Sequence, residues 1–267
     1  MKRSNRTAQL TAMASIVTLL ITSAALAQDS IPTAFRDGTY FSFAGGASNL
    51  SLYGTTLPGT YLQNDGAYES NAAEEAANVR TSGPQYSLSV GYEFARRATI
   101  IYGVEASVSK FDGEHINYSV RSNGSYAASV AYDQGPLVSL RSKIGVVRGT
   151  TMFFGTLGPA LLREKQIRTQ YKTDGQGNST FVTFSESDAE TRYGAALSVG
   201  VRQAVAQDWS MSVELQHFLL APATFHFDAA RAGAGAGGGG NYNVVNGRQA
   251  ESTFKNTVLL IGLTRKF

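Results

Sequence analysis

The stretch Val258-Leu-Leu-Ile-Gly-Leu-Thr-Arg-Lys-Phe267 decides the fold class of this chain. Taken by twos from its end, one face of the stretch is mostly apolar and carries Phe267, Arg265, Leu263, Ile261 and Leu259. The other face carries a glycine and polar side chains among its members. An alternation of apolar and polar positions over about ten residues is typical of a β-strand with one face in lipid and the other in a polar interior.

The same alternation recurs upstream, in 86–94, 193–201 and 209–219, with His217 as the exception in the third stretch. It predicts an all-β fold, an eight-stranded antiparallel up-and-down transmembrane β-barrel. We expect strands at about 39–53, 84–96, 98–112, 137–149, 151–163, 191–206, 208–221 and 253–267. The fifth strand alternates poorly and contains Pro159, which cannot donate to a strand ladder.

The predicted connections alternate in length. Short turns are expected near Arg96-Arg97, Gly149-Thr150 and Gln207-Asp208, and long loops at about 54–83, 113–136, 164–190 and 222–252. Bacterial outer-membrane barrels have short periplasmic turns and longer extracellular loops. We therefore predict a barrel over 39–267 with four extracellular loops.

The first residues are typical of a secretory signal peptide. Lys2, Arg3 and Arg6 precede a short apolar run that ends in the small-x-small pair Ala25 and Ala27. Cleavage after Ala27 is expected to leave a short periplasmic segment, 28–38, before the barrel. The chain has 23 Lys+Arg and 20 Asp+Glu, so loss of the three basic leader residues brings the formal net charge to zero.

A neutral mature chain gives no reason to expect a nucleic-acid partner. The absence of cysteine excludes disulfides and thiolate metal sites. The three histidines, His115, His217 and His226, have no common ligand spacing, so we predict neither a metal site nor another cofactor.

Charged side chains occupy the inward parity of the predicted strands. An eight-stranded barrel is only wide enough for its interior to be filled by side chains, and a buried charge without a partner is costly. We therefore predict an ionic network across the lumen that plugs the barrel; scattered charges in wet pockets at the two mouths are the alternative. The network members are Glu93, Glu105, Arg141, Lys143, Arg192, Arg202 and Glu214.

Three segments of the chain resemble the small eight-stranded outer-membrane barrels of the opacity-protein type, including major surface proteins and "porin family" proteins of α-proteobacteria with an OmpA-like barrel. The segments are Ser139-Leu-Arg-Ser-Lys-Ile-Gly145, Tyr193-Gly-Ala-Ala-Leu-Ser-Val-Gly-Val201 with the following Asp208-Trp-Ser-Met-Ser-Val-Glu214, and Gly262-Leu-Thr-Arg-Lys-Phe267. The last is similar to the signal that the barrel-assembly machinery recognises, and Gly262, Leu263 and Phe267 match it. Arg265 departs from it, because an aromatic residue usually stands there.

The resemblance implies a non-enzymatic integral protein of a Gram-negative outer membrane, a surface antigen whose loops serve envelope integrity, adhesion or surface contact. Its implied partners are outer-membrane lipid and lipopolysaccharide, the barrel-assembly machinery, and a host or surface ligand bound by the loops. A small-solute porin of low conductance is the alternative. A lipid A-modifying enzyme is a second alternative that the sequence disfavours, because such enzymes place a serine two residues after the histidine, where this chain has Leu219 after His217.

Overall fold

A computed structural model of the chain describes residues 32–57, 60–63, 66–69, 75–97, 99–112, 116–122, 126–173, 179–227, 243–246 and 248–267. Within these ranges, no helix has the length and apolar character needed to cross a membrane. The expected cleavage residues, Ala25 and Ala27, lie outside the described residues.

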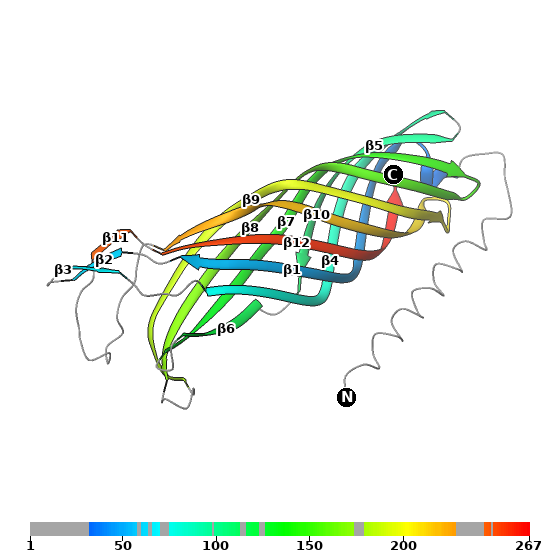
Figure 1. The fold of residues 1–267 in the computed structure, drawn as a ribbon. Helices are drawn as coiled ribbons and strands as arrows, with labels where there is room; N and C mark the ends of the chain where they lie inside the picture. The colour runs from blue at the N-terminus through cyan, green and yellow to red at the C-terminus, as the bar shows by residue number, and fades with distance from the viewer. Residues whose placement is uncertain are drawn as a thin grey trace, which may run out of the picture.

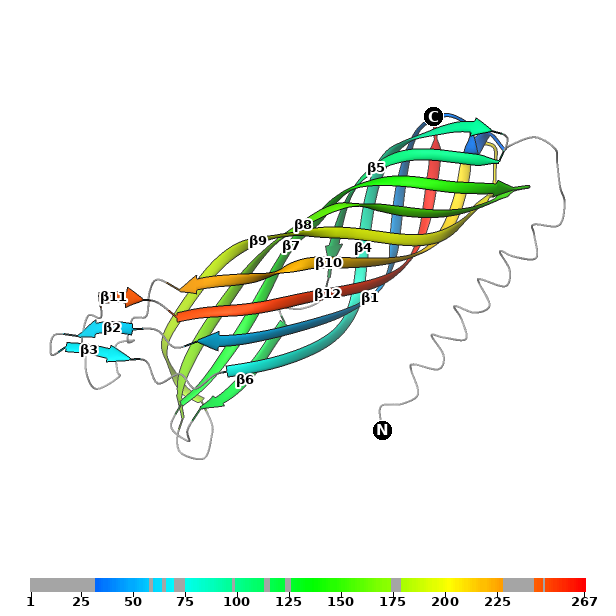
Figure 2. The same cartoon turned by 45° about the horizontal axis from the view of Figure 1, so that its top comes forward.

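The pairing of eight long antiparallel strands closes a ring. Figures 1 and 2 show the resulting barrel in two views. Each strand pairs with its neighbours along the chain, β5 pairs with β7, and the first strand pairs with the last. This confirms the predicted eight-stranded up-and-down barrel. The strands of the ring are β1 Gly38–Leu57, β4 Glu75–Arg97, β5 Ile100–Phe111, β7 Tyr126–Arg148, β8 Thr151–Thr173, β9 Ser179–Ala204, β10 Trp209–Phe227 and β12 Arg248–Lys266.

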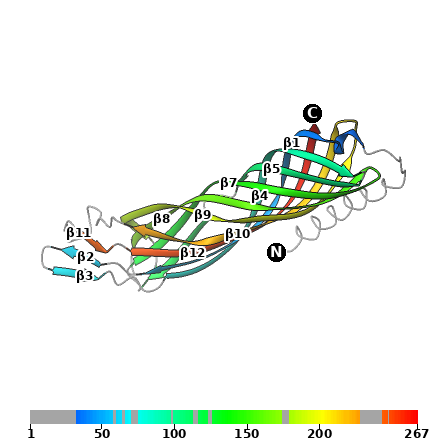
Figure 3. The ribbon, with the colours of Figure 1, turned by 90° about the horizontal axis from the view of Figure 1, so that it is seen from above.

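The two ends of the barrel differ. The tight connections β4–β5, β7–β8 and β9–β10, the C-terminus and the short 3₁₀ helix η2, Thr33–Phe35, lie at one end, which we call the inner end. At the other end, the outer end, β6 Ile116–Ser122 pairs with β7. Beyond it lies a three-stranded sheet of β2 Thr60–Gln63, β3 Gly66–Glu69 and β11 Asn243–Asn246 (Figure 3).

The strands extend further at the outer end than the sequence predicted. Much of the four segments expected as long loops is strand; β8, for example, continues ten residues past the expected end at Arg163, to Thr173. Pro159 does not end this strand, because it pairs in register with Ala195 of β9 and its side chain faces outward. The barrel is therefore longer, and its outer connections are shorter, than the pattern indicated.

Apolar side chains cover the outside of the inner half of the barrel. Outward positions such as Phe43, Leu88, Ile144, Val199 and Leu263 are each 44–61% exposed. We call this surface the apolar belt. Exposing so many large apolar side chains to water would be costly, and a lipid bilayer removes that cost.

The interior changes character along the barrel. Charged and hydroxyl side chains fill it within the belt, whereas an apolar cluster begins near the outer edge of the belt and continues above it. Above the belt the outward positions become polar, and a bulge between Leu220 and Ala223 moves Phe225 and Phe227 to the inside. The alternation that marks a strand in lipid is therefore inverted there, which explains why these segments were predicted as loops.

Candidate functional site in the barrel lumen

Glu93 of β4 lies at the centre of a cluster of cations contributed by three other strands. Its carboxylate accepts from Arg202 Nη1 at 2.8 Å, from Lys266 Nζ at 3.0 Å and from Lys143 Nζ at 3.4 Å. All four side chains are almost completely buried, with at most 4% exposure. One carboxylate thus joins β4 to β7, β9 and β12 across the lumen.

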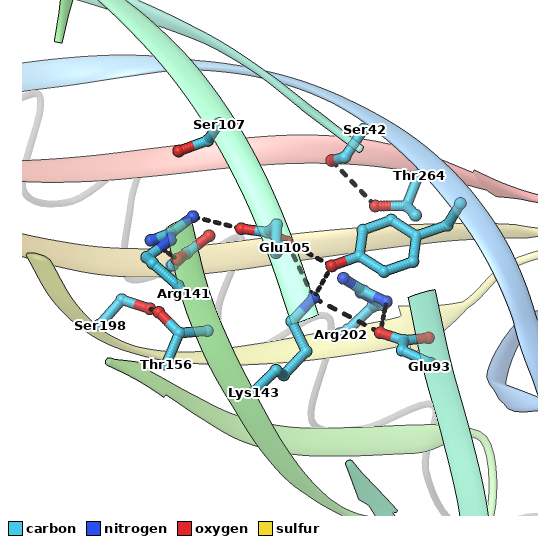
Figure 4. A network of polar contacts seen from close by, with 12 residues as sticks. Ser42, Glu93, Glu105, Ser107, Arg141, Lys143, Thr156, Ser198, Arg202 and Thr264 are labelled. Atoms are coloured by element: carbon cyan, nitrogen blue, oxygen red, sulfur yellow. Dashed lines mark hydrogen bonds and ion pairs between the residues drawn. The ribbon is translucent and has the colours of Figure 1, made fainter. Parts of the chain in front are cut away.

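Glu105 of β5 forms the second centre of the network (Figure 4). It pairs with Lys143 Nζ at 2.9 Å and with the guanidinium of Arg141, which also donates to Glu214 Oε1 at 3.1 Å. Lys143 contacts both Glu93 and Glu105, so the two centres are continuous. The network contains charges of both signs, which lowers the cost of burying them together.

The ring of Tyr40 lies within this network. Its hydroxyl donates to Glu105 Oε2 at 2.5 Å and accepts from Lys143 Nζ at 2.5 Å. The cationic groups of Lys143 and Arg202 lie 4.3 and 5.1 Å from the ring centroid, within the range of cation–π attraction. A side chain at Gly91 would place its Cβ 2.5 Å from the ring, so glycine there makes room for Tyr40.

The structure brings together Glu93, Glu105, Arg141, Lys143, Arg202 and Glu214 of the predicted set, and places Arg192 apart from them. The pattern missed Lys266, which lies in the stretch that was interpreted as a lipid-facing strand and sorting signal. It also missed Tyr40. Their inward parity was the available signal: Tyr40 is fully buried and Lys266 is 5% exposed.

Arg192 belongs to a second polar site nearer the outer end. It pairs with Glu164 at 2.5 Å and donates to Ser252 O at 2.8 Å. Glu164 lies above the belt, since its strand neighbours Arg163 and Lys165 are exposed on the outside. Burial raises the pKa of the Glu164 carboxyl, and the charge of Arg192 opposes that rise.

Between these two sites lies a layer of buried hydroxyls. The pairs Ser107–Ser139 and Thr156–Ser198 each lie at 2.7 Å, and Thr264 donates to Ser42 at 3.0 Å. Each pair joins neighbouring strands of the ring. Their hydrogen-bonding groups are thus partly satisfied by the protein itself, without a ligand.

Apolar clusters lie on both sides of the polar layers. At the inner end, Phe35 of η2 is fully buried against a small cluster with Ile101, Met152 and Phe154. At the outer end the larger cluster includes Leu52, Phe218 and Phe225. Side chains thus occupy the described lumen in successive layers from the inner mouth to the outer extension.

On the outside of the barrel, His217 has a partner that the sequence did not reveal. Its Nδ1 lies 2.8 Å from Thr257 Oγ1 on β12. Thr257 is 40 residues away in the sequence, and the register between β10 and β12 places it opposite His217. The sequence around His217 therefore gives no sign of this hydroxyl. Glu214 faces the lumen and bonds Arg141, and no described carboxylate contacts His217.

The C-terminal segment lies where its pattern predicts. Leu263 and Phe267 face outward with 44% and 70% exposure, and Gly262 faces inward. Arg265, which departs from the assembly-signal pattern, lies 5.6 Å from the Trp209 ring and 5.1 Å from the Phe267 ring. The cation thus rests between two aromatic faces at the inner edge of the belt.

No protein-family model and no curated protein sequence matches the chain. Among solved structures, the chain is similar to outer membrane protein OprG of Pseudomonas aeruginosa, with 13% identity, TM-score 0.45, and 87% of this chain and 97% of that chain covered. It is also similar to Neisserial surface protein A, with 11% identity, TM-score 0.33, and 86% and 99% covered. A third is Ail, the attachment invasion locus protein of Yersinia pestis, with 12% identity, TM-score 0.31, and 84% and 99% covered. Identities and TM-scores this low do not indicate a function. The barrel architecture of this chain is established by its own strand pairing and by the difference between its apolar exterior and its polar lumen.

Proposed function

We propose that the protein is a non-enzymatic integral protein of the outer membrane, whose barrel anchors the chain and carries its outer extension into the external medium. The observation that carries this proposal is the polarity of the inner half of the barrel. Its exterior is apolar and its lumen is filled with polar side chains, which is the reverse of a water-soluble barrel. A closed barrel leaves no strand edge unpaired, so its backbone is satisfied within lipid. The outer membrane and its lipopolysaccharide are then its surroundings.

The filled lumen supports an anchor rather than a pore. Water and ions would have to displace two apolar clusters and a network in which Glu93 alone contacts three cations. In planar bilayers we expect the purified barrel to insert without a stable open state of nanosiemens size. A reproducible conductance of that size would instead support the small-solute porin and overturn the closed lumen.

The display role can be tested at the connection between β8 and β9. An epitope inserted within 174–178, beyond the described ends of both strands, should be detected by antibody on intact cells. An epitope in the 149–150 turn at the inner end is the matched control, and it should be detected only after the cells are permeabilised. The opposite result would invert the proposed orientation. Adhesion or contact with a host surface is the role that we propose for the displayed segments.

The alternative function is a lipid-modifying activity. The hydrogen bond between His217 and Thr257 on the outside of the barrel is the observation that makes it worth testing. Mass spectrometry of lipid A from cells with and without the protein tests it. We expect identical lipid A. A changed acyl pattern that disappears in His217→Ala would show an enzyme.

A further inference from the structure

Two neighbouring rows of outward residues cross β10, β12, β1 and β4 at the outer edge of the apolar belt. Strand register aligns His217, Thr257, Asn49 and Ser82 in the first row, and Leu219, Lys255, Ser51 and Arg80 in the second. The row below them is apolar, with Leu215, Leu259, Ala47 and Pro84. The exterior therefore changes from apolar to cationic over two rows.

We propose that this patch binds a phosphate group of a lipid A molecule in the outer leaflet. This inference rests on the proposed outer-membrane location and deepens it by naming the lipid group and the residues that meet it. Lys255 and Arg80 both flank Ser51, so their backbones are about 10 Å apart, which is two strand spacings. Both long side chains can reach a single phosphate held above Ser51.

The charge balance of the patch favours an anion. Arg80 and Lys255 are both exposed, and no carboxylate among the described residues pairs with either of them. The outward acid on β12, Glu251, lies four residues beyond Lys255, about 13 Å along the strand. Cations that lack an acidic neighbour at a membrane interface attract anionic headgroups.

The groups between the two cations can complete a phosphate site. Ser51, Ser82 and Asn49 are hydrogen-bonding side chains on adjacent strands, and they face the same side of the sheet as the cations. A guanidinium and an ammonium with hydroxyl donors between them match a tetrahedral phosphate. Other cations near the outer edge differ, because Lys165 lies opposite Asp133 and Lys110 donates to Gln134 O at 2.9 Å.

The position of the patch argues for a membrane lipid rather than a soluble anion. The apolar row below it, which includes Leu215 at 47% exposure, continues directly into the belt. A lipid whose phosphate rests on the patch would therefore lay its acyl chains along the belt. A soluble phosphate would gain nothing from that apolar surface.

The test uses the full mature chain folded in detergent micelles, with lipid A binding followed by native mass spectrometry. Arg80→Gln/Lys255→Gln should weaken binding of bis-phosphorylated lipid A about thirtyfold, since each interfacial cation contributes about 1 kcal/mol. The matched control, Arg163→Gln/Lys165→Gln, removes two outward cations from β8 and should retain wild-type binding. An equal loss of lipid A affinity in the two double variants would show that any pair of surface cations contributes to binding, and it would overturn the proposed site.

A second arm needs no variant. Wild-type protein should bind bis-phosphorylated lipid A about thirtyfold more tightly than the same lipid after removal of its phosphates, and equal binding would overturn the inference. Millimolar inorganic phosphate should not compete; effective competition would identify a free-phosphate site instead. Gel mobility with and without boiling reports the folded barrel separately. A wild-type protein that shows no folded, membrane-inserted form would refute the proposed function, whereas normal insertion with unchanged lipid A binding in the variants would refute this inference alone.

Discussion

Glu93 should be the most sensitive polar residue of the lumen, and Glu93→Gln tests this. The substitution keeps the shape of the side chain but removes the charge that three cations share, at 2.8, 3.0 and 3.4 Å. Each contact has a gross attraction of about 4 kcal/mol in a partly polarisable interior, and desolvation offsets much of it. Leaving buried cations without a partner should destabilise the barrel by about 3–5 kcal/mol.

The charge count of the network predicts an asymmetry. Glu93, Glu105 and Glu214 face four cations, Arg141, Lys143, Arg202 and Lys266, so the network has one excess positive charge. Removal of Glu93 increases that excess, whereas Lys266→Gln cancels it. We therefore expect Lys266→Gln to cost less than half as much as Glu93→Gln.

Urea unfolding in detergent measures both effects through the fluorescence of Trp209, the single tryptophan of the chain. Glu251→Gln, at an exposed outward position of β12, is the control and should leave the unfolding midpoint unchanged. A Glu93→Gln barrel within about 0.5 kcal/mol of wild type, or a Lys266→Gln barrel that is at least as unstable as Glu93→Gln, would refute the network as the element that holds the lumen together.

Three further outcomes are expected. Gly46→Ala should destabilise the β1–β12 seam by about 3 kcal/mol, because its Cβ would lie 1.8 Å from Leu259 O, while Gly45→Ala, whose Cβ has no contact closer than 3.5 Å, should fold normally; gel mobility after graded heating compares them. Phe35→Ala should lower the unfolding free energy by about 3 kcal/mol in the urea assay, because the fully buried ring closes the inner mouth. Raising the salt concentration from about 0.1 to 1 M should barely move the wild-type midpoint, because the network is buried and poorly screened; a large loss of stability would show that water enters the lumen.

The inner half of the fold could be predicted from sequence because lipid and lumen impose opposite polarity on alternate residues. The terminal stretch 258–267 shows this, and it pairs with β1 and β10 as part of the ring. The short turn at Gly149-Thr150 was also predicted, and in the structure it joins β7 to β8. Period and turn chemistry are local properties, so a single sequence reveals them.

The outer extension could not be predicted, because there the apolar residues face the lumen and the polar residues face outward, the opposite of a strand in lipid. Phe225 and Phe227 are buried in the lumen, and their outward neighbours Thr224 and His226 lack the apolar character expected of a lipid face. Bulges near Gln134 and Leu220 shift the parity within a strand. A pattern search that assumes one polarity and one phase along each strand ends at these points.

The sequence predicted which charged residues line the lumen but not which of them form ion pairs with one another. Inward parity identified Arg141 and Lys143 as buried charges, and burial required partners for them. Which acid each one meets depends on shear and register around the ring, which place Glu105 opposite Arg141 and leave Arg192 beside Glu164. The same dependence on register hid the contact between His217 and Thr257.

The two halves of the barrel belong to one continuous sheet but are stabilised differently, because their exteriors meet different solvents. Within the belt the exterior meets lipid, so apolar packing between strands gains little, and the buried polar network supplies specific contacts across the lumen. Above the belt the exterior meets water, and the apolar cluster that contains Leu52 and Phe218 supplies a hydrophobic core like that of a water-soluble barrel. The outer half therefore has its own source of stability in water. Such a core lets the strands continue beyond the membrane, as the proposed display role requires.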